Sequence, residues 1–171
     1  MKNIILVFGL IAALWTSADA DDQKEKGNKH KGITPVTNEL YKKSCGSCHF
    51  AYQPGLLPKR SWTKIIDTKG AHTGGDLTLD KATKEKIRAY LGQESADTSS
   101  SERSRKIVSS IPSNSTPVRV ADVPYIQKKH HEINKDIFKR PSIGSAGNCK
   151  ACHKSAEQGI YEDDDVDIPA K

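Results

Sequence analysis

The sequence predicts a mainly α-helical protein of two lobes, in which irregular loops join short helices. Three observations support this prediction. The pentapeptide Cys-x-x-Cys-His occurs twice, at residues 45–49 and 149–153, near opposite ends of the chain. Stretches with apolar residues at helical spacing are short, and proline, glycine and serine separate them. With 35% hydrophobic and 6% aromatic residues and a mean hydropathy of −0.64, the chain has little core material of its own.

Residues 1–20 have the pattern of an export signal. Lys2 gives a basic start, an apolar run covers residues 4–15, and the small residues of Ala18-Asp19-Ala20 predict cleavage after Ala20. The run is short for a membrane span, although a retained anchor is the alternative. The segment carries one cation and one anion, so its removal leaves the formal charge at +6. We therefore expect a periplasmic protein.

The first lobe is predicted to cover residues 37–95, after a lysine-rich, disordered arm at residues 21–36. Thr37 or Asn38 is placed to cap a helix that leads into the first pentapeptide. Prolines then predict an irregular loop over residues 50–58. Two helices follow. The first is predicted from an apolar face of Trp62, Ile65 and Ile66, and the second is a helix that Asp80 caps and Gly92 ends.

Residues 96–120 read as a serine-rich linker with a possible short helix at residues 101–110. The second lobe is predicted to cover residues 121–171. Pro124 is placed to start a helix, and Asn148 to cap the one that carries the second pentapeptide. Apolar spacing predicts one continuous face on the Pro124 helix, formed by Ile126, His130, Ile133 and Ile137.

The spacing within each pentapeptide is that of c-type haem attachment. Two thiols three residues apart project from one helical turn and can bond the two vinyl groups of one porphyrin, while the histidine binds its iron. A zinc site or a redox dithiol also uses paired cysteines. Zinc needs neither following histidine, however, and a dithiol explains only one pair. We therefore predict two covalently bound haem c groups, held by Cys45, Cys48, Cys149 and Cys152, with His49 and His153 on iron.

Composition narrows the choice of the second axial ligands. Met1 is the only methionine and leaves with the signal, so the mature chain cannot form His/Met haems. His130 lies on the predicted apolar face, where a polar ring needs a partner, and the adjacent His131 is its alternative. His72 lies in a glycine-flanked loop that is free to cover a ring, whereas His30 belongs to the arm. His72 follows His49 by 23 positions, and His130 precedes His153 by 23.

Several stretches resemble the bacterial dihaem cytochrome c (DHC) family. They are Leu-Tyr-Lys-Lys-Ser before Cys45, Pro-Gly-Leu-Leu-Pro at residues 54–58, and Arg-Pro-Ser-Ile-Gly-Ser-Ala-Gly-Asn before Cys149. The resemblance covers residues 38–168. It implies a periplasmic electron carrier with bis-histidine ligation, in which His72 and His130 are the second ligands. It also implies a membrane-bound b-type cytochrome as donor and a monohaem oxygen-binding cytochrome, or another periplasmic protein, as acceptor.

The residues point to electron transfer rather than catalysis, because no nucleophile–base pair or paired acid/base carboxylates stand out. The alternative is a small dihaem enzyme or gas sensor with one open haem site. A basic exported chain suits an acidic redox partner, and it carries no nucleic-acid motif. We expect a monomer that does not bind nucleic acid.

Overall fold

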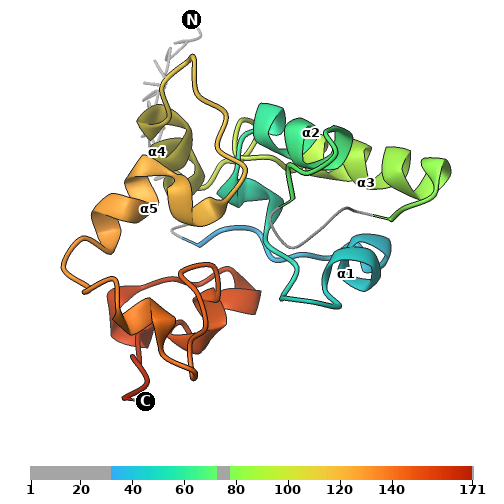
Figure 1. Cartoon of the computed structure of the whole chain (residues 1–171). Coiled ribbons are helices and arrows are strands. Elements are labelled where there is room, and N and C mark those ends of the chain that lie inside the picture. The colour runs from blue at the N-terminus through green and yellow to red at the C-terminus, as the bar shows by residue number, and fades with distance from the viewer. Residues whose placement is uncertain (1–31, 73–77, 171) are drawn as a thin grey trace, which may run out of the picture.

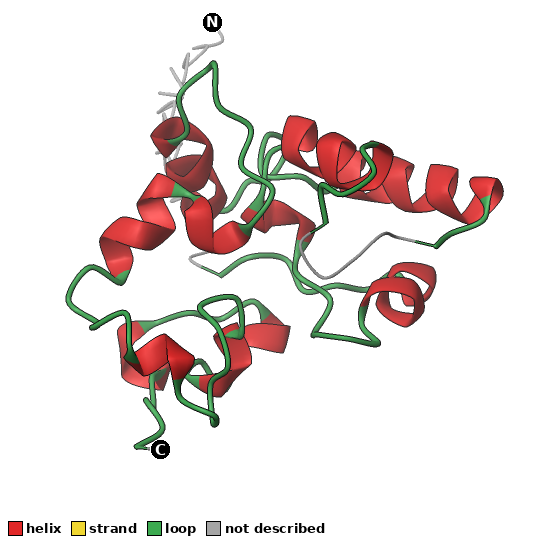
Figure 2. Ribbon diagram, viewed as in Figure 1, coloured by secondary structure: helices red, strands yellow, loops and turns green. Residues whose placement is uncertain are grey.

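The computed structural model describes residues 32–72 and 78–170, and these residues form a mainly helical protein without a β-strand (Figures 1 and 2). A single β-bridge joins His153 to Val166. The prediction of a mainly α fold is therefore confirmed. The α-helices are α1 (Glu39–Cys45), α2 (Lys59–Asp67), α3 (Lys81–Gln93), α4 (Glu102–Ser110) and α5 (Pro124–Lys129).

Short 3-10 turns complete the structure, and they are unevenly distributed. In the described part of the chain, every helical element after α5 is a 3-10 turn of three residues. This C-terminal region, orange to red in Figure 1, lies below α4 and α5. The turns are η1 (Pro54–Leu56), η2 (Val120–Asp122), η3 (Ile137–Lys139), η4 (Cys149–Ala151), η5 (Ala156–Gln158) and η6 (Asp163–Asp165).

Side-chain caps fix where three of the helices begin. Asn38 accepts a 2.9 Å hydrogen bond from the Tyr41 N–H, and Asp80 accepts one of 2.9 Å from the Thr83 N–H, as predicted. Ser101 caps α4 in the same way. The end of α3 differs from the prediction, because Gly92 lies inside the helix. The Glu94 N–H still bonds to the Tyr90 carbonyl, so the helix continues for one more residue.

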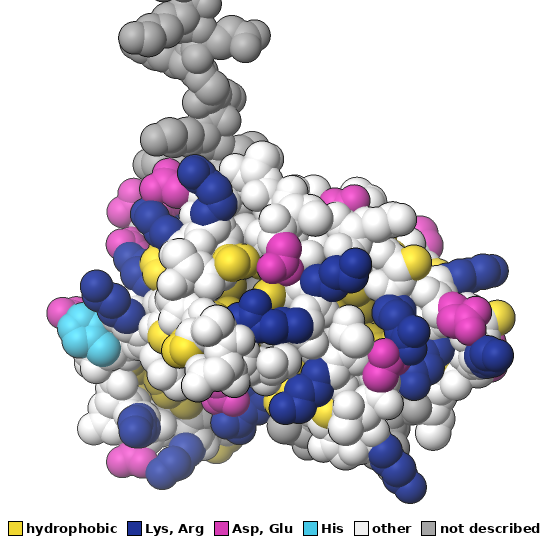
Figure 3. Space-filling model, turned by 90° about the horizontal axis from the view of Figure 1, so that it is seen from above, with side chains coloured by type: hydrophobic (Ala, Val, Ile, Leu, Met, Phe, Trp, Pro, Cys, Tyr) yellow, Lys and Arg dark blue, Asp and Glu magenta, His cyan; other side chains and the backbone are white. Residues whose placement is uncertain are grey.

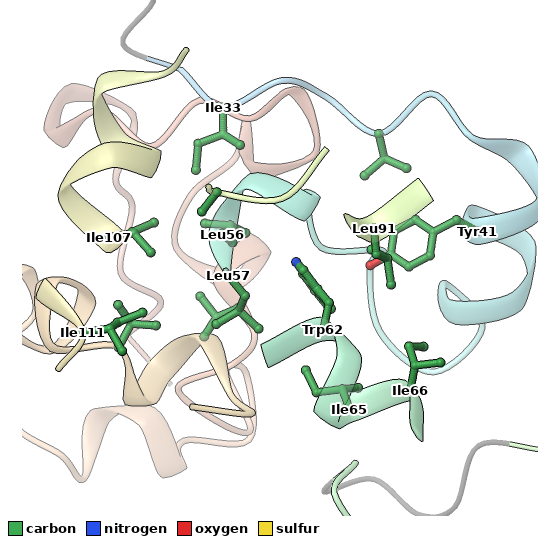
Figure 4. Packing of buried hydrophobic residues seen from close by; sticks show 14 of the residues in the cluster. Ile33, Tyr41, Leu56, Leu57, Trp62, Ile65, Ile66, Leu91, Ile107 and Ile111 are labelled. Carbon is green, nitrogen blue, oxygen red and sulfur yellow. The ribbon is translucent and has the colours of Figure 1, made fainter. Parts of the chain in front are cut away.

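The hydrophobic core lies mainly between α2 and α3 and around η1. The predicted α2 face is buried, with Trp62 6%, Ile65 8% and Ile66 6% exposed, and it belongs to one cluster with Leu57 and Leu91 (Figure 4). The Trp62 indole N–H donates a 2.8 Å hydrogen bond to the Pro54 carbonyl, so this buried polar group is satisfied. This contact joins α2 to the loop that follows the first pentapeptide.

Residues 33–36 do not belong to the predicted arm. Ile33 is fully buried, and its N–H donates a 2.9 Å hydrogen bond to the Gly159 carbonyl. Gly159 has a φ of +74°, and a Cβ atom there would lie 1.8 Å from the Ile33 carbonyl oxygen, so only glycine fits. The first described residues therefore contact the C-terminal region. Residues 21–31, and the predicted signal at residues 1–20, lie outside the described part.

The serine-rich segment at residues 96–120 is not a linker. It contains α4, which matches the predicted short helix, and α4 packs against α5. Ile107 is fully buried, and so is Ser104, whose hydroxyl donates a 2.8 Å hydrogen bond to the Gly55 carbonyl. Serine is small and loses little on burial when its hydroxyl is paired, which is why a serine-rich composition is compatible with a core position here.

The long apolar face predicted from Ile126 to Ile137 is also wrong, since α5 ends at Lys129. Asn134 accepts a 2.9 Å hydrogen bond from the Asp136 N–H, which makes a local turn in place of a further helical turn. His130 is consequently the residue that ends α5. No helix in the described ranges, 32–72 and 78–170, is long and apolar enough to cross a membrane.

Two candidate haem sites

The first site begins at the end of α1, where Cys45 is the last helical residue. The Gly46 N–H closes the helix by donating a 2.8 Å hydrogen bond to the Lys42 carbonyl. A Cβ atom at Gly46 would lie 2.5 Å from that carbonyl oxygen, so glycine allows the tight exit from the helix. Cys48 and His49 follow on an exposed turn. The first pentapeptide is thus anchored at its start and open at its end.

His72 lies beside His49 although the two are separated by α2. Their ring centroids are 6.0 Å apart and their planes are inclined by 24°. The His49 Nδ1 lies 2.7 Å from the Phe50 carbonyl oxygen. Because a carbonyl oxygen can only accept, this contact places a proton on Nδ1, so that in the neutral ring Nε2 is the electron-pair donor.

The second site is built on the 3-10 turn η4 rather than on the predicted helix. Asn148 does not cap it, because its amide donates to the Ile143 carbonyl at 2.9 Å. The His153 N–H donates a 2.8 Å hydrogen bond to the Cys149 carbonyl, and the Asp167 N–H bonds to the Cys152 carbonyl at 2.9 Å. These backbone contacts fix the second pentapeptide without a regular helix.

His130 is the residue that lies beside His153. The ring centroids are 6.0 Å apart, with the planes at 79°. The His130 Nδ1 lies 2.8 Å from the Ile126 carbonyl oxygen, so in the neutral ring Nε2 is again the electron-pair donor. The neighbouring His131 has a side chain that is 69% exposed, next to Glu132. The structure therefore brings His130, and not His131, to the second motif.

The spacing of both histidine pairs fits an iron atom between the rings. With a metal–nitrogen distance of about 2 Å and a ring nitrogen about 1 Å from its centroid, two axial imidazoles have centroids about 6 Å apart. Both observed separations are 6.0 Å. The carbonyl contacts of His49 and His130 are of the kind that orients metal-bound histidines.

The protonation of the cysteines argues against a reactive dithiol. Burial raises the pKa of Cys45 to about 11 and that of Cys149 to about 11. Both thiols are therefore neutral near pH 7, whereas redox-active cysteines have a lowered pKa. Within residues 32–72 and 78–170, no three His, Cys, Asp or Glu side chains are grouped as a metal-binding cluster. A zinc site thus finds no support in this geometry.

Two tyrosines next to the motif histidines were not predicted from the sequence. The Tyr52 ring lies 5.0 Å from the His49 ring, and the Tyr161 ring lies 5.4 Å from the His153 ring, centroid to centroid. Burial raises the pKa of Tyr52 to about 12, so its hydroxyl remains a hydrogen-bond donor. In the sequence, only the closeness of Tyr52 to the first pentapeptide indicates that it lies at a haem site, and nothing indicates this for Tyr161.

The same tyrosines connect the two sites. The Tyr52 hydroxyl donates a 2.5 Å hydrogen bond to the Gly147 carbonyl, and the Tyr161 hydroxyl donates one of 2.6 Å to the Gln53 side-chain oxygen. Gln53 is fully buried, and its amide nitrogen lies 2.6 Å from the Ala156 carbonyl oxygen. Adjacent residues of the first lobe therefore hold the turns of the second.

Comparison with known proteins identifies the family. Residues 41–161 match the sequence profile of the family described as Dihaem cytochrome c. This chain belongs to the dihaem cytochrome c family. It is similar to the solved dihaem cytochrome c of Rhodobacter sphaeroides, with 34% identity and a TM-score of 0.65, over 75% of this chain and 100% of that one. No curated protein matches it.

A second solved dihaem cytochrome c, from Shewanella baltica OS155, is 30% identical, with a TM-score of 0.62, over 78% of this chain and 94% of that one. As a dihaem cytochrome c, the protein contains two covalently bound haem c groups. The resemblance noted from the sequence is confirmed. The dihaem cytochromes c are generally electron-transfer proteins, and proteins of this type are typically exported to the periplasm.

Proposed function

We propose that this dihaem cytochrome c is an electron carrier in which both irons are bound by two histidines. Cys45 and Cys48 attach one haem and Cys149 and Cys152 the other, with His49 paired to His72 and His130 paired to His153. The observation that supports this most directly is the common separation of 6.0 Å in the two histidine pairs. Iron supplies a one-electron couple when it is bound there.

The residues of the chain set how that couple is used. His49 with His72, and His130 with His153, would each hold one iron and so keep small ligands away from it. The Phe50 and Ile126 carbonyls hold the rings of His49 and His130 in place. A thioether ligand would raise the potential, but the only methionine is Met1. The proposal therefore includes low potentials for both haems.

We further propose the periplasm as location, with cleavage after Ala20. A membrane-bound b-type cytochrome is the proposed donor, and a monohaem oxygen-binding cytochrome or another periplasmic protein is the proposed acceptor. The polypeptide has a formal charge of +6, which the haem propionates reduce, and this positive balance suits an acidic surface on a partner. Lys and Arg side chains are scattered over the face seen in Figure 3, with acidic side chains between them. Such a surface favours transient electrostatic docking by a monomer.

Electron paramagnetic resonance of the oxidised holoprotein tests the ligation. We expect two low-spin signals and no binding of carbon monoxide to the reduced protein. His130→Ala should make one iron high-spin and open to carbon monoxide, and His72→Ala should do the same at the other site. His131→Ala is the matched control and should leave both signals unchanged.

The alternative function predicts different spectra. A dihaem enzyme or gas sensor requires one open axial position, so a high-spin signal in the unaltered protein would support it. A loss of one low-spin signal in His131→Ala, with His130→Ala unaffected, would instead exchange the roles of these two histidines.

A further inference from the structure

Tyr52 contacts both candidate haem sites. Its ring lies 5.0 Å from the ring of His49, at an inclination of 43°. Its hydroxyl donates a 2.5 Å hydrogen bond to the Gly147 carbonyl, 95 positions further along the chain. The Tyr52 carbonyl accepts a 2.9 Å hydrogen bond from the Tyr41 hydroxyl, which fixes the backbone of Tyr52. A single half-buried side chain therefore spans the junction of the two lobes.

The contacts continue from Gly147 into the second attachment motif. The Gly147 carbonyl oxygen accepts the Cys149 N–H at 3.0 Å and lies 3.6 Å from the Cys149 sulfur. A Cβ atom at Gly147 would lie 3.0 Å from the Tyr52 hydroxyl, so glycine is what lets the tyrosine approach so closely. Between His49 and Cys149 there is thus one ring contact, one hydrogen bond and one short stretch of backbone.

We propose that Tyr52 is the bridge through which the two haem sites exchange electrons. This inference rests on the proposed function, with His49 as an iron ligand and Cys149 as an attachment point. In the exchange, one electron leaves the ferrous iron of one site and reaches the ferric iron of the other. One iron is oxidised as the other is reduced, no covalent bond forms or breaks, and the tyrosine keeps its proton.

Tyr161 makes a reciprocal contact but does not complete a comparable path. Its ring lies 5.4 Å from the ring of His153, and its hydroxyl donates to the Gln53 side chain at 2.6 Å. A path for the electron from Gln53 to His49 would have to follow the backbone to Tyr52. Tyr161 and Gln53 therefore clamp the two lobes together, whereas Tyr52 connects the two sites.

The two tyrosines provide a matched pair of variants, since Tyr52→Phe and Tyr161→Phe each remove one hydroxyl that crosses between the lobes. The measurement is the rate of electron exchange within half-reduced holoprotein, from exchange broadening of the haem methyl proton resonances. Repetition at several dilutions excludes exchange between molecules. The midpoint potentials and the unfolding midpoint are recorded for each variant.

We expect Tyr52→Phe to slow the exchange severalfold and Tyr52→Leu, which also removes the ring, to slow it further. Tyr161→Phe should lower the unfolding midpoint without a comparable change in the exchange rate. Gly147→Ala, which keeps Tyr52 but displaces its hydroxyl, should slow the exchange as Tyr52→Phe does. It serves as a second variant if the tyrosine variants assemble poorly.

An unchanged exchange rate in the Tyr52 variants overturns the proposal. Equal slowing by Tyr52→Phe and Tyr161→Phe also overturns it, because both tyrosines would then act only as clamps. A failure of the proposed function would look different. In that case the unaltered holoprotein would show a high-spin iron, or a haem that is not reversibly reduced, whatever residue occupies position 52.

Discussion

Around His49 and His72 the chain is built from α1, α2 and α3, whereas around His153 it is built from three-residue turns, with His130 at the end of the short helix α5. Both scaffolds place two imidazole rings 6.0 Å apart. In the first lobe, helices that pack on each other determine where the rings lie. In the second lobe, backbone hydrogen bonds between successive turns and contacts with the first lobe do so. The same ligand geometry thus does not require the same secondary structure.

The two lobes differ most in the number of buried apolar residues that each contains. Among the described residues, Ile143, Ala156 and Tyr161 are the only buried apolar residues after Val123. A buried large apolar side chain contributes about 1.5–3 kcal/mol, so two such side chains and one alanine cannot offset the ordering of the whole segment. The second lobe therefore depends on its porphyrin and on Ile33, Tyr52 and Gln53. Composition predicts a poor core for the entire chain, and the structure confines this deficit to the C-terminal region.

The largest expected effect follows from removing one haem at a time. Replacing Cys149 and Cys152 with alanine should leave residues 130–170 without protection in hydrogen exchange, while α2, α3 and α4 keep theirs. Replacing Cys45 and Cys48 should leave most of the helical circular dichroism. If both double variants lost protection evenly over the chain, the lobes would not differ in the way described.

The contact between Ile33 and Gly159 is the next test. Gly159→Ala and Gly144→Ala both place alanine at a positive φ, +74° and +79°, where a side chain costs about 1–3 kcal/mol. At Gly144 no atom lies within 4 Å of the new methyl group, whereas at Gly159 it would overlap the Ile33 carbonyl. We expect the denaturant midpoint of the holoprotein to fall clearly further for Gly159→Ala. Equal midpoints would show that Ile33 adds nothing to the second lobe.

The buried amide of Gln53 gives a smaller effect. Gln53→Leu leaves the Tyr161 hydroxyl without its acceptor and leaves the Ala156 carbonyl with only the Gly159 N–H, and a buried unpaired polar group costs about 1–3 kcal/mol. Ser61→Ala is the control, because the buried Ser61 hydroxyl has no hydrogen-bond partner and its loss should be neutral or slightly stabilising. Chemical denaturation of the two holoproteins compares them. A neutral Gln53→Leu would mean that the lobes do not need this contact.

The smallest expected effect is on stability at acidic pH, and it concerns only the first lobe. Hydrogen bonds from the side chain and backbone of Thr83 lower the pKa of Asp80, the cap of α3. Because the folded pKa lies below the unfolded value of about 3.9, the stabilisation is complete above pH 4 and is lost as the pH falls through the folded pKa. Asp80→Asn should flatten the dependence of the thermal midpoint on pH in this acid range. An unchanged acid profile would show that the cap makes no contribution.

Local chemistry explains what the sequence could predict. The caps at Asn38 and Asp80 and the apolar face of α2 follow from side chains a few residues apart, and the structure has them where they were expected. The attachment motifs were equally readable, because covalent chemistry fixes their spacing. The placing of His72 beside His49 and of His130 beside His153 agrees with their equal sequence separations.

Long-range packing explains what the sequence could not predict. Ile33 follows a lysine-rich stretch and has no periodic neighbours, so nothing nearby indicates that Gly159 receives it. Ser101 and Ser104 look like linker residues until the Gly55 carbonyl is found opposite the Ser104 hydroxyl. In both cases the deciding partner is at least 49 positions away. Such pairings are set by the tertiary fold and leave no trace in a local window.

The residues that join the lobes lie far apart in the chain, with Tyr52 and Gly147 separated by 95 positions and Gln53 and Tyr161 by 108. A nascent polypeptide cannot form these pairs until almost all of it has been synthesised, and contacts of such long range close slowly. The junction between the lobes is therefore expected to form after the local contacts within each lobe.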